Sequence, residues 1–273
     1  MDDRLSYAYG VLRPAPSLER DALSAVRGVA DAPVALVRHH DLAAAVSPVP
    51  RADFSEAALK AHLEDLEWLE GVARAHHGVV ETLGAHATVL PLRLATVYLD
   101  DARVRDMLGE RQETLTTLLD RLADHVEWGV KVYADASSPA ARPAPADTAE
   151  AADPGRAYLR QRRQQRHARE DAWSAAAEAV RRIEGQAGTL AVAHARHRPQ
   201  RGRLAGGAGG AGENVSNDAY LVPRERAEEF RALILDTAQG LPGIRVEVTG
   251  PWVPYSFAQV PDAQAAPEGA PQR

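Results

Sequence analysis

The segment Trp128-Gly129-Val130-Lys131-Val132-Tyr133 alternates large apolar side chains with glycine and lysine, a pattern typical of a half-buried β-strand. Beyond it, the pattern predicts a helix over about 156–186, strands at 190–195 and 219–222, a helix over about 224–239 and a strand at 244–248. In a ferredoxin-like domain the same order of elements places two helices on one face of an antiparallel sheet. We therefore predict an α+β fold of this kind for the C-terminal half, with a long first helix.

The residues before this segment predict a second α+β domain, a modified form of the ferredoxin-like plan. Its expected elements are a strand at 5–12, a weak helix near 18–29, a hairpin of 34–37 and 42–46, an amphipathic helix after Ser55, a strand at 87–94 and a helix after Asp100. Ser55 is the expected N-cap of the amphipathic helix because its hydroxyl can accept from a backbone N–H of the first turn.

The charge distribution supports a division into two domains. Residues 1–125 carry 13 basic and 20 acidic side chains, whereas residues 126–273 carry 19 and 18. We predict an N-terminal α+β domain over 1–125 and a ferredoxin-like domain over 126–258. The second domain is expected to contain a mobile linker at 137–155, rich in Pro, Ala and Ser, and a glycine-rich loop at 198–213, and a disordered tail is expected at 259–273.

Composition excludes several classes of protein. The 273 residues include no cysteine, which excludes disulfides, thiolate metal sites and a cysteine nucleophile, and favours a reducing compartment. Acidic residues at the start, Asp2 and Asp3, are unlike a secretory signal, and no apolar run approaches the roughly 18 residues that a membrane span requires. The expected location is the cytoplasm, with no membrane partner.

Catalytic and metal-binding patterns are absent from the sequence. The histidine pairs His39-His40, His76-His77 and His194 with His197 lack metalloprotease spacing, and we interpret them as surface or helix-terminal residues. No serine lies in a nucleophile motif, and the run of residues 206–212 lacks the spacing of a phosphate-binding loop. We therefore predict no enzyme activity, no catalytic or metal site and no cofactor.

A concentration of arginine is the main indication of nucleic-acid binding. Residues 153–203 hold 12 arginines and 5 acidic residues. An RNA-binding sheet would also present aromatic side chains on its central strands, but the two candidate strands offer only Tyr220. The prediction is therefore no nucleic acid, and a solvated face or a docking surface for an acidic protein is favoured. A nucleic-acid-binding or small-molecule-binding regulatory module remains the alternative function.

Several short segments along the chain are distinctive. They are Tyr7-Ala8-Tyr9-Gly10-Val11, Ala44-Ala45-Val46-Ser47-Pro48-Val49-Pro50, Val89-Leu90-Pro91-Leu92-Arg93-Leu94-Ala95-Thr96-Val97, Glu127-Trp128-Gly129-Val130-Lys131-Val132, Ala157-Tyr158-Leu159, Asn217-Asp218-Ala219-Tyr220-Leu221-Val222 and Gly250-Pro251-Trp252-Val253-Pro254-Tyr255-Ser256-Phe257. In this order they resemble the motifs of the GvpF/GvpL family of gas vesicle accessory proteins. Leu94 and Ala95 replace the family's usual Phe and Gly, and Val253 replaces a proline. We expect Ala95 to adopt an ordinary strand conformation.

The resemblance implies a non-enzymatic role in gas vesicle assembly. It suggests that the protein binds the small hydrophobic shell protein GvpA, other gas vesicle accessory proteins, or both, and is gas vesicle associated in the cytoplasm, with the acidic first domain as the favoured contact. The candidate interaction residues lie in the family-like motifs: Tyr7, Tyr9, Leu92, Arg93, Trp252, Tyr255 and Phe257. Core packing is the favoured role for most of them, and the last three concentrate aromatic rings in a segment that needs a docking surface.

Overall fold

A computed structural model describes residues 3–14, 18, 23–24, 26–62, 64–134, 154–199, 212–237, 239 and 243–259. The chain divides into two compact units. Unit 1 contains residues up to Asp124 together with the segment from Val253 onward, and unit 2 is His125–Trp252. The segment that follows Trp252 therefore belongs with the N-terminal residues, whereas the sequence placed it in the C-terminal domain.

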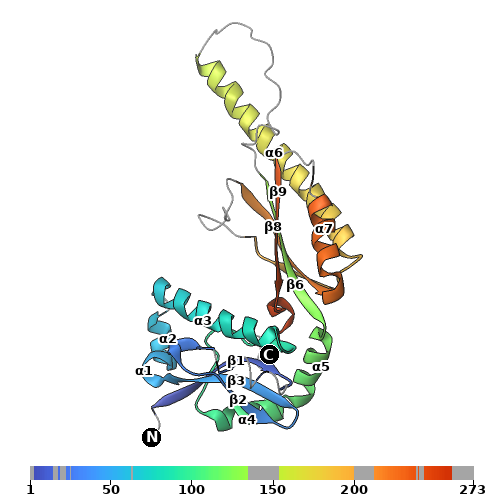
Figure 1. Ribbon diagram of the computed structural model, residues 1–273. Helices are drawn as coiled ribbons and strands as arrows, with labels where there is room; N and C mark the ends of the chain where they lie inside the picture. The colour runs from blue at the N-terminus through green and yellow to red at the C-terminus, as the bar shows by residue number, and fades with distance from the viewer. Residues whose placement is uncertain are drawn as a thin grey trace, which may run out of the picture. The chain divides into compact units, whose positions relative to one another are not determined.

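Unit 1 is built on an antiparallel sheet in the order β2-β3-β1-β4, with β5 also paired to β1 (Figure 1). Its strands are β1 (Arg4–Leu12), β2 (Ala35–His39), β3 (Leu42–Pro50), β4 (Val89–Pro91) and β5 (Val97–Tyr98). The hairpin of β2 and β3 turns at His40, as the sequence predicts. The predicted strand at 87–94 is shorter than expected, because it ends at Pro91 and a turn follows.

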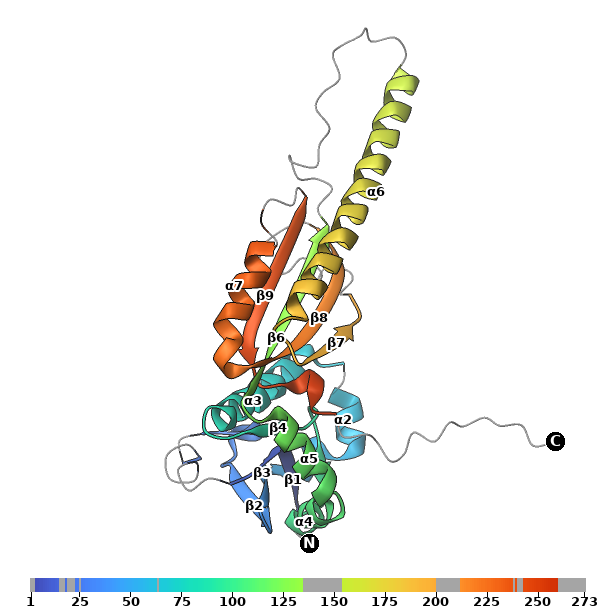
Figure 2. The same cartoon turned by 90° about the vertical axis from the view of Figure 1, so that its right-hand side faces the viewer.

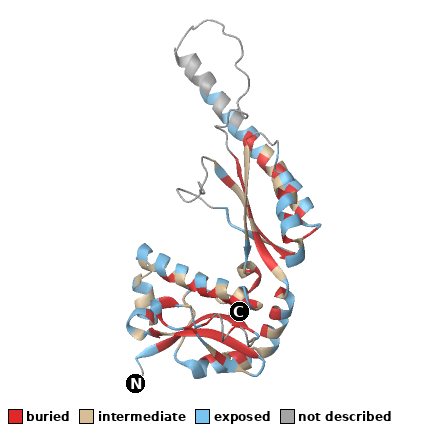
Figure 3. Ribbon diagram, viewed as in Figure 1, coloured by how far each residue is buried: buried red, intermediate tan, exposed pale blue. Residues whose placement is uncertain are grey.

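Helices cover both faces of this sheet, as Figure 1 shows for α3 and α4. The helices of unit 1 are α1 (Arg51–Phe54), α2 (Glu56–His62), α3 (Leu66–Gly84), α4 (Asp101–Glu110) and α5 (Gln112–Leu122), with the 3₁₀ turns η2 (Val29–Asp31) and η6 (Tyr255–Phe257). Every residue of β1 after Arg4 is buried, which is why the sheet needs a cover on both sides (Figure 3). Helices on both faces are therefore one way in which unit 1 departs from the ferredoxin-like plan, which the sequence predicts here only in modified form.

Local capping explains why the predicted helix after Ser55 is divided. Ser55 Oγ accepts from Ala58 N at 3.4 Å at the start of α2, but Asp65 caps a new helix, α3, by accepting from Trp68 N at 3.0 Å. The apolar face of α3 packs on β1 through Val72, Val79 and Leu83. Of the weak helix expected near 18–29, residues 19–22 and 25 lie outside the described residues, and the rest contains a turn at Leu23 and the start of the short 3₁₀ turn Val29–Asp31.

Unit 2 is a four-stranded antiparallel sheet in the order β7-β8-β6-β9. Its elements are β6 (His125–Ala134), α6 (Pro154–Ala187), β7 (Ala193–His197), β8 (Glu213–Pro223), the 3₁₀ turn η5 (Arg224–Arg226), α7 (Ala227–Thr237) and β9 (Ile244–Trp252). Figure 2 shows α6 and α7 on one face of this sheet, where the core includes Trp128, Tyr220 and Phe230.

The two antiparallel sheets with their helices confirm the mixed α+β class. The proposed linker at 137–155 and tail at 259–273 lie almost wholly outside the described residues, as does most of the glycine-rich loop at 198–213. Among the described residues, none of the helices combines the length and the hydrophobicity needed to span a bilayer.

Candidate functional site

The family-like motifs of unit 1 meet around a turn formed by Arg93-Leu94-Ala95-Thr96. Thr96 N and Oγ1 both donate to the carbonyl of Arg93, at 3.2 and 2.6 Å, and close the turn. Three hydrogen bonds then fix it to β1: Leu92 N donates to Tyr9 O at 2.9 Å, Ala8 N to Thr96 O at 2.9 Å, and Ala95 N to the Tyr7 hydroxyl at 3.0 Å. Tyr7 and Leu92 thus belong to one hydrogen-bonded support for the turn.

The turn requires one residue with a left-handed backbone conformation. Ala95 has φ 61, a conformation that glycine adopts without steric cost but alanine does not. The expectation of an ordinary strand conformation at Ala95 is therefore wrong, because the chain reverses at Leu94 instead of continuing β4.

Ala95→Gly is expected to raise the free energy of unfolding of unit 1 by up to about 1 kcal/mol, since a left-handed alanine costs about 1–2 kcal/mol and part of this gain is offset by the greater entropy of unfolded glycine. Urea unfolding followed by pulsed hydrogen exchange of peptides from β1 measures the change. Ala85 is the control, because it has φ −70 at the end of α3 and Ala85→Gly should give no gain. A destabilising Ala95→Gly would contradict the argument.

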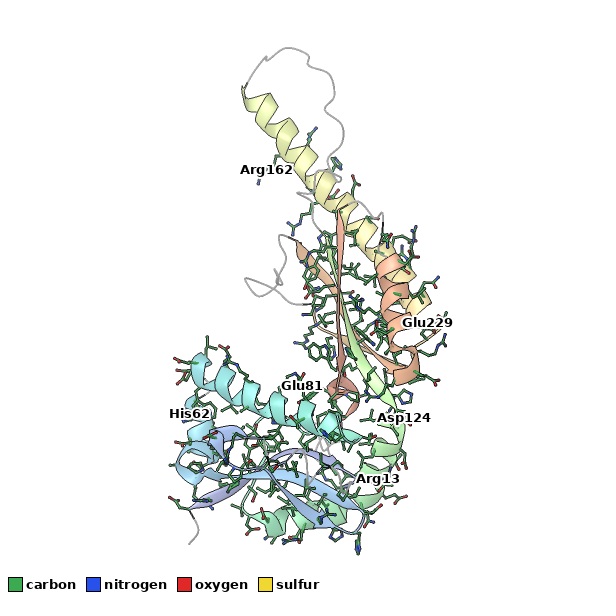
Figure 4. The ribbon with its side chains drawn as sticks, viewed as in Figure 1. Arg13, His62, Glu81, Asp124, Arg162 and Glu229 are labelled. Carbon is green, nitrogen blue, oxygen red and sulfur yellow. The ribbon has the colours of Figure 1, made fainter. Side chains whose placement is uncertain are left out.

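Leu94 forms one side of an apolar groove that we call the α2–α3 groove. Its volume is about 170 Å³, and it is lined by Glu56, Leu59, Lys60, Trp68, Leu69, Val72, Leu94 and Ala95. The Leu94 side chain is 42% exposed, an unusual exposure for a leucine whose turn is so well anchored. Trp68 is held in the groove wall by Phe54, with ring centroids 5.4 Å apart, and by His62, stacked at 4.3 Å (His62 is labelled in Figure 4).

His76 lies behind the turn, buried among tyrosines. Its Nδ1 is 3.0 Å from the Tyr7 hydroxyl, and its ring centroid lies 5.5 Å from that of Tyr9 and 6.4 Å from that of Tyr255. Burial lowers the pKa of His76 to about 4, an effect that the backbone of Leu92 partly opposes. The interpretation of this histidine as a surface residue is wrong. Its spacing of four residues from both Val72 and Val80 could have placed it on the buried face of α3.

Burial separates the seven candidate interaction residues into two groups. Tyr7, Tyr9 and Phe257 are buried, and the hydroxyl of Tyr9 accepts from Val29 N at 2.8 Å, so these three side chains support the fold. Tyr255 and Leu92 are partly buried, while Arg93 and Trp252 are exposed. The turn brings Leu92 and Arg93 together, but Trp252 lies at the end of β9 in unit 2.

The aromatic segment after Trp252 packs on α3. Val253 and Tyr255 contact the core of unit 1, and a Cβ added at Gly84 would lie 2.5 Å from Val253 Cγ2, so glycine permits this close approach. Tyr255 also lines a second pocket of about 230 Å³ with Arg93, Tyr98 and Arg111. This volume is below the roughly 300–1,000 Å³ usual for ligand sites, so this pocket by itself gives little support to a small-molecule function.

The arginines of α6 are partly neutralised within unit 2. Arg166 pairs with Glu170 at 3.0 Å, Arg169 with Glu213 at 2.9 Å and Arg182 with Glu178 at 3.1 Å. Arg162, labelled in Figure 4, is exposed. Tyr220 is buried on the helix-covered face of the sheet and cannot stack on a base. Nothing in this arrangement favours nucleic-acid binding over a solvated helix.

These features define a mixed α+β protein in which an anchored turn presents an apolar groove. Residues 5–259 match the family model described as gas vesicle synthesis protein GvpL/GvpF. The chain is 43% identical over 259 residues to gas vesicle protein L of Streptomyces sp. (strain CB03234), covering 94% of both chains. It is 30% identical over 266 residues to gas vesicle protein F of the same strain, covering 93% of this chain and 99% of the relative.

Crystal structures of GvpF proteins have the same overall fold at low sequence identity. The GvpF of Anabaena sp. PCC7120 matches with a TM-score of 0.65 and 18% identity, over 94% of this chain and 97% of that one. The GvpF of Microcystis aeruginosa matches with a TM-score of 0.62 and 18% identity, over 94% of this chain and 99% of that one. The chain therefore belongs to the GvpL/GvpF family of gas vesicle proteins, which confirms the resemblance of its motifs.

Proposed function

We propose that this protein assists gas vesicle assembly without catalysis, by binding the hydrophobic shell protein GvpA, and that other gas vesicle accessory proteins are further partners. Family membership supports the role in assembly. The observation that carries the binding proposal is the α2–α3 groove, in which an exposed leucine completes an apolar surface.

The groove suits an amphipathic segment of a partner. An amphipathic helix inserts apolar side chains spaced three and four residues apart into such a groove, and burial of each side chain contributes about 1.5–3 kcal/mol before the costs of association. Glu56 of α2 lines the groove, where it pairs with Lys60 at 2.7 Å, and Glu67 is an exposed acidic residue of α3. A basic residue next to the apolar positions of the partner would complement the carboxylate of Glu56.

Leu94→Glu is expected to reduce capture of GvpA at least tenfold, because a carboxylate in the groove removes apolar surface and would itself be desolvated by the partner. The measurement is co-expression with GvpA of the same organism, followed by affinity capture and an assay of soluble GvpA. Leu99→Glu is the matched control, since Leu99 is an exposed leucine of unit 1 that does not line the groove.

The two variants distinguish failure of the site from failure of the partner. Equal capture by wild type, Leu94→Glu and Leu99→Glu would exclude the groove as the contact but retain GvpA as the partner. An absence of capture by wild type, with GvpA independently soluble, would exclude GvpA and favour a scaffold for other accessory proteins. Thermal unfolding of both variants checks that neither substitution disturbs the fold.

Two finer assignments accompany this proposal. Unit 2 is proposed to be ferredoxin-like, since its elements β6-α6-β7-β8-α7-β9 form a sheet in the order β7-β8-β6-β9 with both helices on one face. The protein is proposed to act in the cytoplasm beside the gas vesicle, a location that its family membership supports.

A further inference from the structure

Three side chains able to bind a cation converge on the helix-covered face of unit 2. They are Glu184 of α6, His194 of β7 and Asp218 of β8, and one ligand atom from each lies within 4.8 Å of the others. His194 Nε2 is 2.9 Å from Asp218 Oδ1. Each residue comes from a different element, so the cluster is created by tertiary packing.

The central member is a buried acid. The Asp218 side chain is 6% exposed, and a carboxylate at such depth needs positive charge or hydrogen bonds to offset its lost hydration. His194 supplies one hydrogen bond to this carboxylate. The side chains of His194 and Glu184 are 31% and 26% exposed, which leaves the cluster open to an ion arriving from solvent.

Tyr220 provides an independent sign that the cluster is incomplete. It is 2% exposed, and its hydroxyl has no hydrogen-bond partner among the described residues. Its ring stacks on that of His194, with centroids 4.6 Å apart and planes 5° apart, and the charges of Asp218 and Glu184 add to burial in raising its pKa. A buried hydroxyl needs a hydrogen-bond partner, so a water or an ion is expected close to that of Tyr220. Both carboxylates are near enough to interact electrostatically with it.

We propose that Glu184, His194 and Asp218 bind a divalent transition-metal ion, for which Zn²⁺ is the best fit. One imidazole nitrogen and two carboxylates are common zinc ligands, and a fourth position would hold a water to which Tyr220 can donate. Ligands about 2.1 Å from zinc lie about 3.4 Å apart in a tetrahedron, so small side-chain rotations would close this cluster around the ion. The bound ion would tie α6 to the β7–β8 pair.

Arg196 competes with a metal ion for the carboxylate of Glu184. Its Nη2 lies 2.6 Å from Glu184 Oε1, and its own side chain is 70% exposed. A metal ion must share or displace this guanidinium before the carboxylate can bind. Removing the guanidinium is therefore expected to strengthen metal binding, whereas removing a ligand weakens it.

The test is titration of Zn²⁺ into the untagged, metal-free full-length protein by calorimetry, with thermal unfolding measured in the same buffer. One ion should bind per chain and raise the unfolding temperature, since a ligand of the native state stabilises it. His194→Ala should weaken binding at least tenfold, and Arg196→Gln should strengthen it severalfold. His197→Ala is the matched control, because His197 is an exposed histidine of the same strand outside the cluster.

Two results would overturn the proposal. One is the absence of saturable binding by wild type. The other is equal affinity in wild type and His194→Ala, which would assign any bound zinc to other surface groups. Asp218→Asn tests the buried ligand. If that variant does not fold, the variants at the partly exposed His194 and Arg196 still show whether the cluster binds zinc. Capture of GvpA by His194→Ala reports separately on the proposed function.

Discussion

Trp128→Ala is expected to lower the free energy of unfolding of unit 2 by about 3–5 kcal/mol, the usual cost of removing a large aromatic side chain from a packed core. Trp128 is 1% exposed and lies in the central strand β6, opposite Tyr220 of β8. Its ring centroid is 6.3 Å from that of Phe230 on α7. One side chain therefore joins two strands and a helix, and alanine would leave a cavity among all three.

The backbone around Trp128 restricts relaxation into that cavity. Gly250 has φ 135, and an added Cβ there would lie 3.0 Å from Trp128 Cε3, so β9 already passes closer to the ring than a residue with a side chain would allow. Because the sheet is hydrogen-bonded on both sides of β6, the strands cannot easily move together to fill the space. Little relaxation into the cavity is therefore expected, although removal of the buried indole N–H, which has no hydrogen-bond partner among the described residues, offsets part of the loss.

Trp173→Ala is the matched control for this experiment. Trp173 is 38% exposed on α6, and its Nε1 donates to Glu213 Oε2 at 3.2 Å, so its removal should cost no more than about 1 kcal/mol. Urea unfolding, followed by pulsed hydrogen exchange of peptides from β6, reports on unit 2 by itself. Equal losses in the two variants would show that Trp128 is not the centre of this core.

The strands of both units could be predicted from sequence because their alternation is a local property. Val130 and Val132 alternate with Gly129 and Lys131, and the structure places them in β6 as expected. The aromatic start of the chain likewise predicts β1 at nearly its observed length. In both cases the same residues determine the local conformation and the buried face, so a period of two residues is sufficient evidence.

The turn at Leu94 and the cluster around His194 could not be predicted in the same way. A run of apolar residues through Leu94 continues the strand pattern, but the chain reverses there, with Ala95 in a left-handed conformation and its N–H bonded to the distant Tyr7 hydroxyl. The cluster of Glu184, His194 and Asp218 spans 35 residues and depends on the packing of α6 against the sheet. Such arrangements are products of tertiary structure, and spacing along the chain does not encode them.

His76 should make unit 1 sensitive to acid. The Tyr7 hydroxyl accepts from Ala95 N, so its own hydrogen is available to His76 Nδ1, which can accept it only while the imidazole is neutral. The charged and titratable groups around the ring are Tyr7 and Tyr9 of β1, Tyr255 of η6 and the neighbouring His77 of α3. None of these groups supplies a negative charge at neutral pH to stabilise an imidazolium.

The pKa of His76 fixes the direction and the range of this effect. Native His76 has a pKa of about 4, below the ordinary value of 6.5, so between these values the unfolded chain binds a proton that the native state does not. The free energy of unfolding should therefore fall by about 1.4 kcal/mol per pH unit from pH 6.5 to pH 4, about 3 kcal/mol in total, and this contribution is fully present above pH 6.5.

The test compares the pH dependence of unit 1 in wild type and His76→Gln, by urea unfolding with pulsed hydrogen exchange of β1 peptides at a fixed labelling pH. Glutamine does not titrate. The free energy of unfolding of this variant should therefore fall less steeply than that of wild type between pH 6.5 and pH 4, whatever the stability of the variant at neutral pH. His86→Gln, at an exposed histidine, should keep the wild-type slope. Identical slopes in wild type and His76→Gln would exclude this histidine as the source. A reduced slope in His76→Gln would link acid sensitivity to the support of the turn that presents Leu94, because protonation removes the acceptor that holds the Tyr7 hydroxyl beside Ala95.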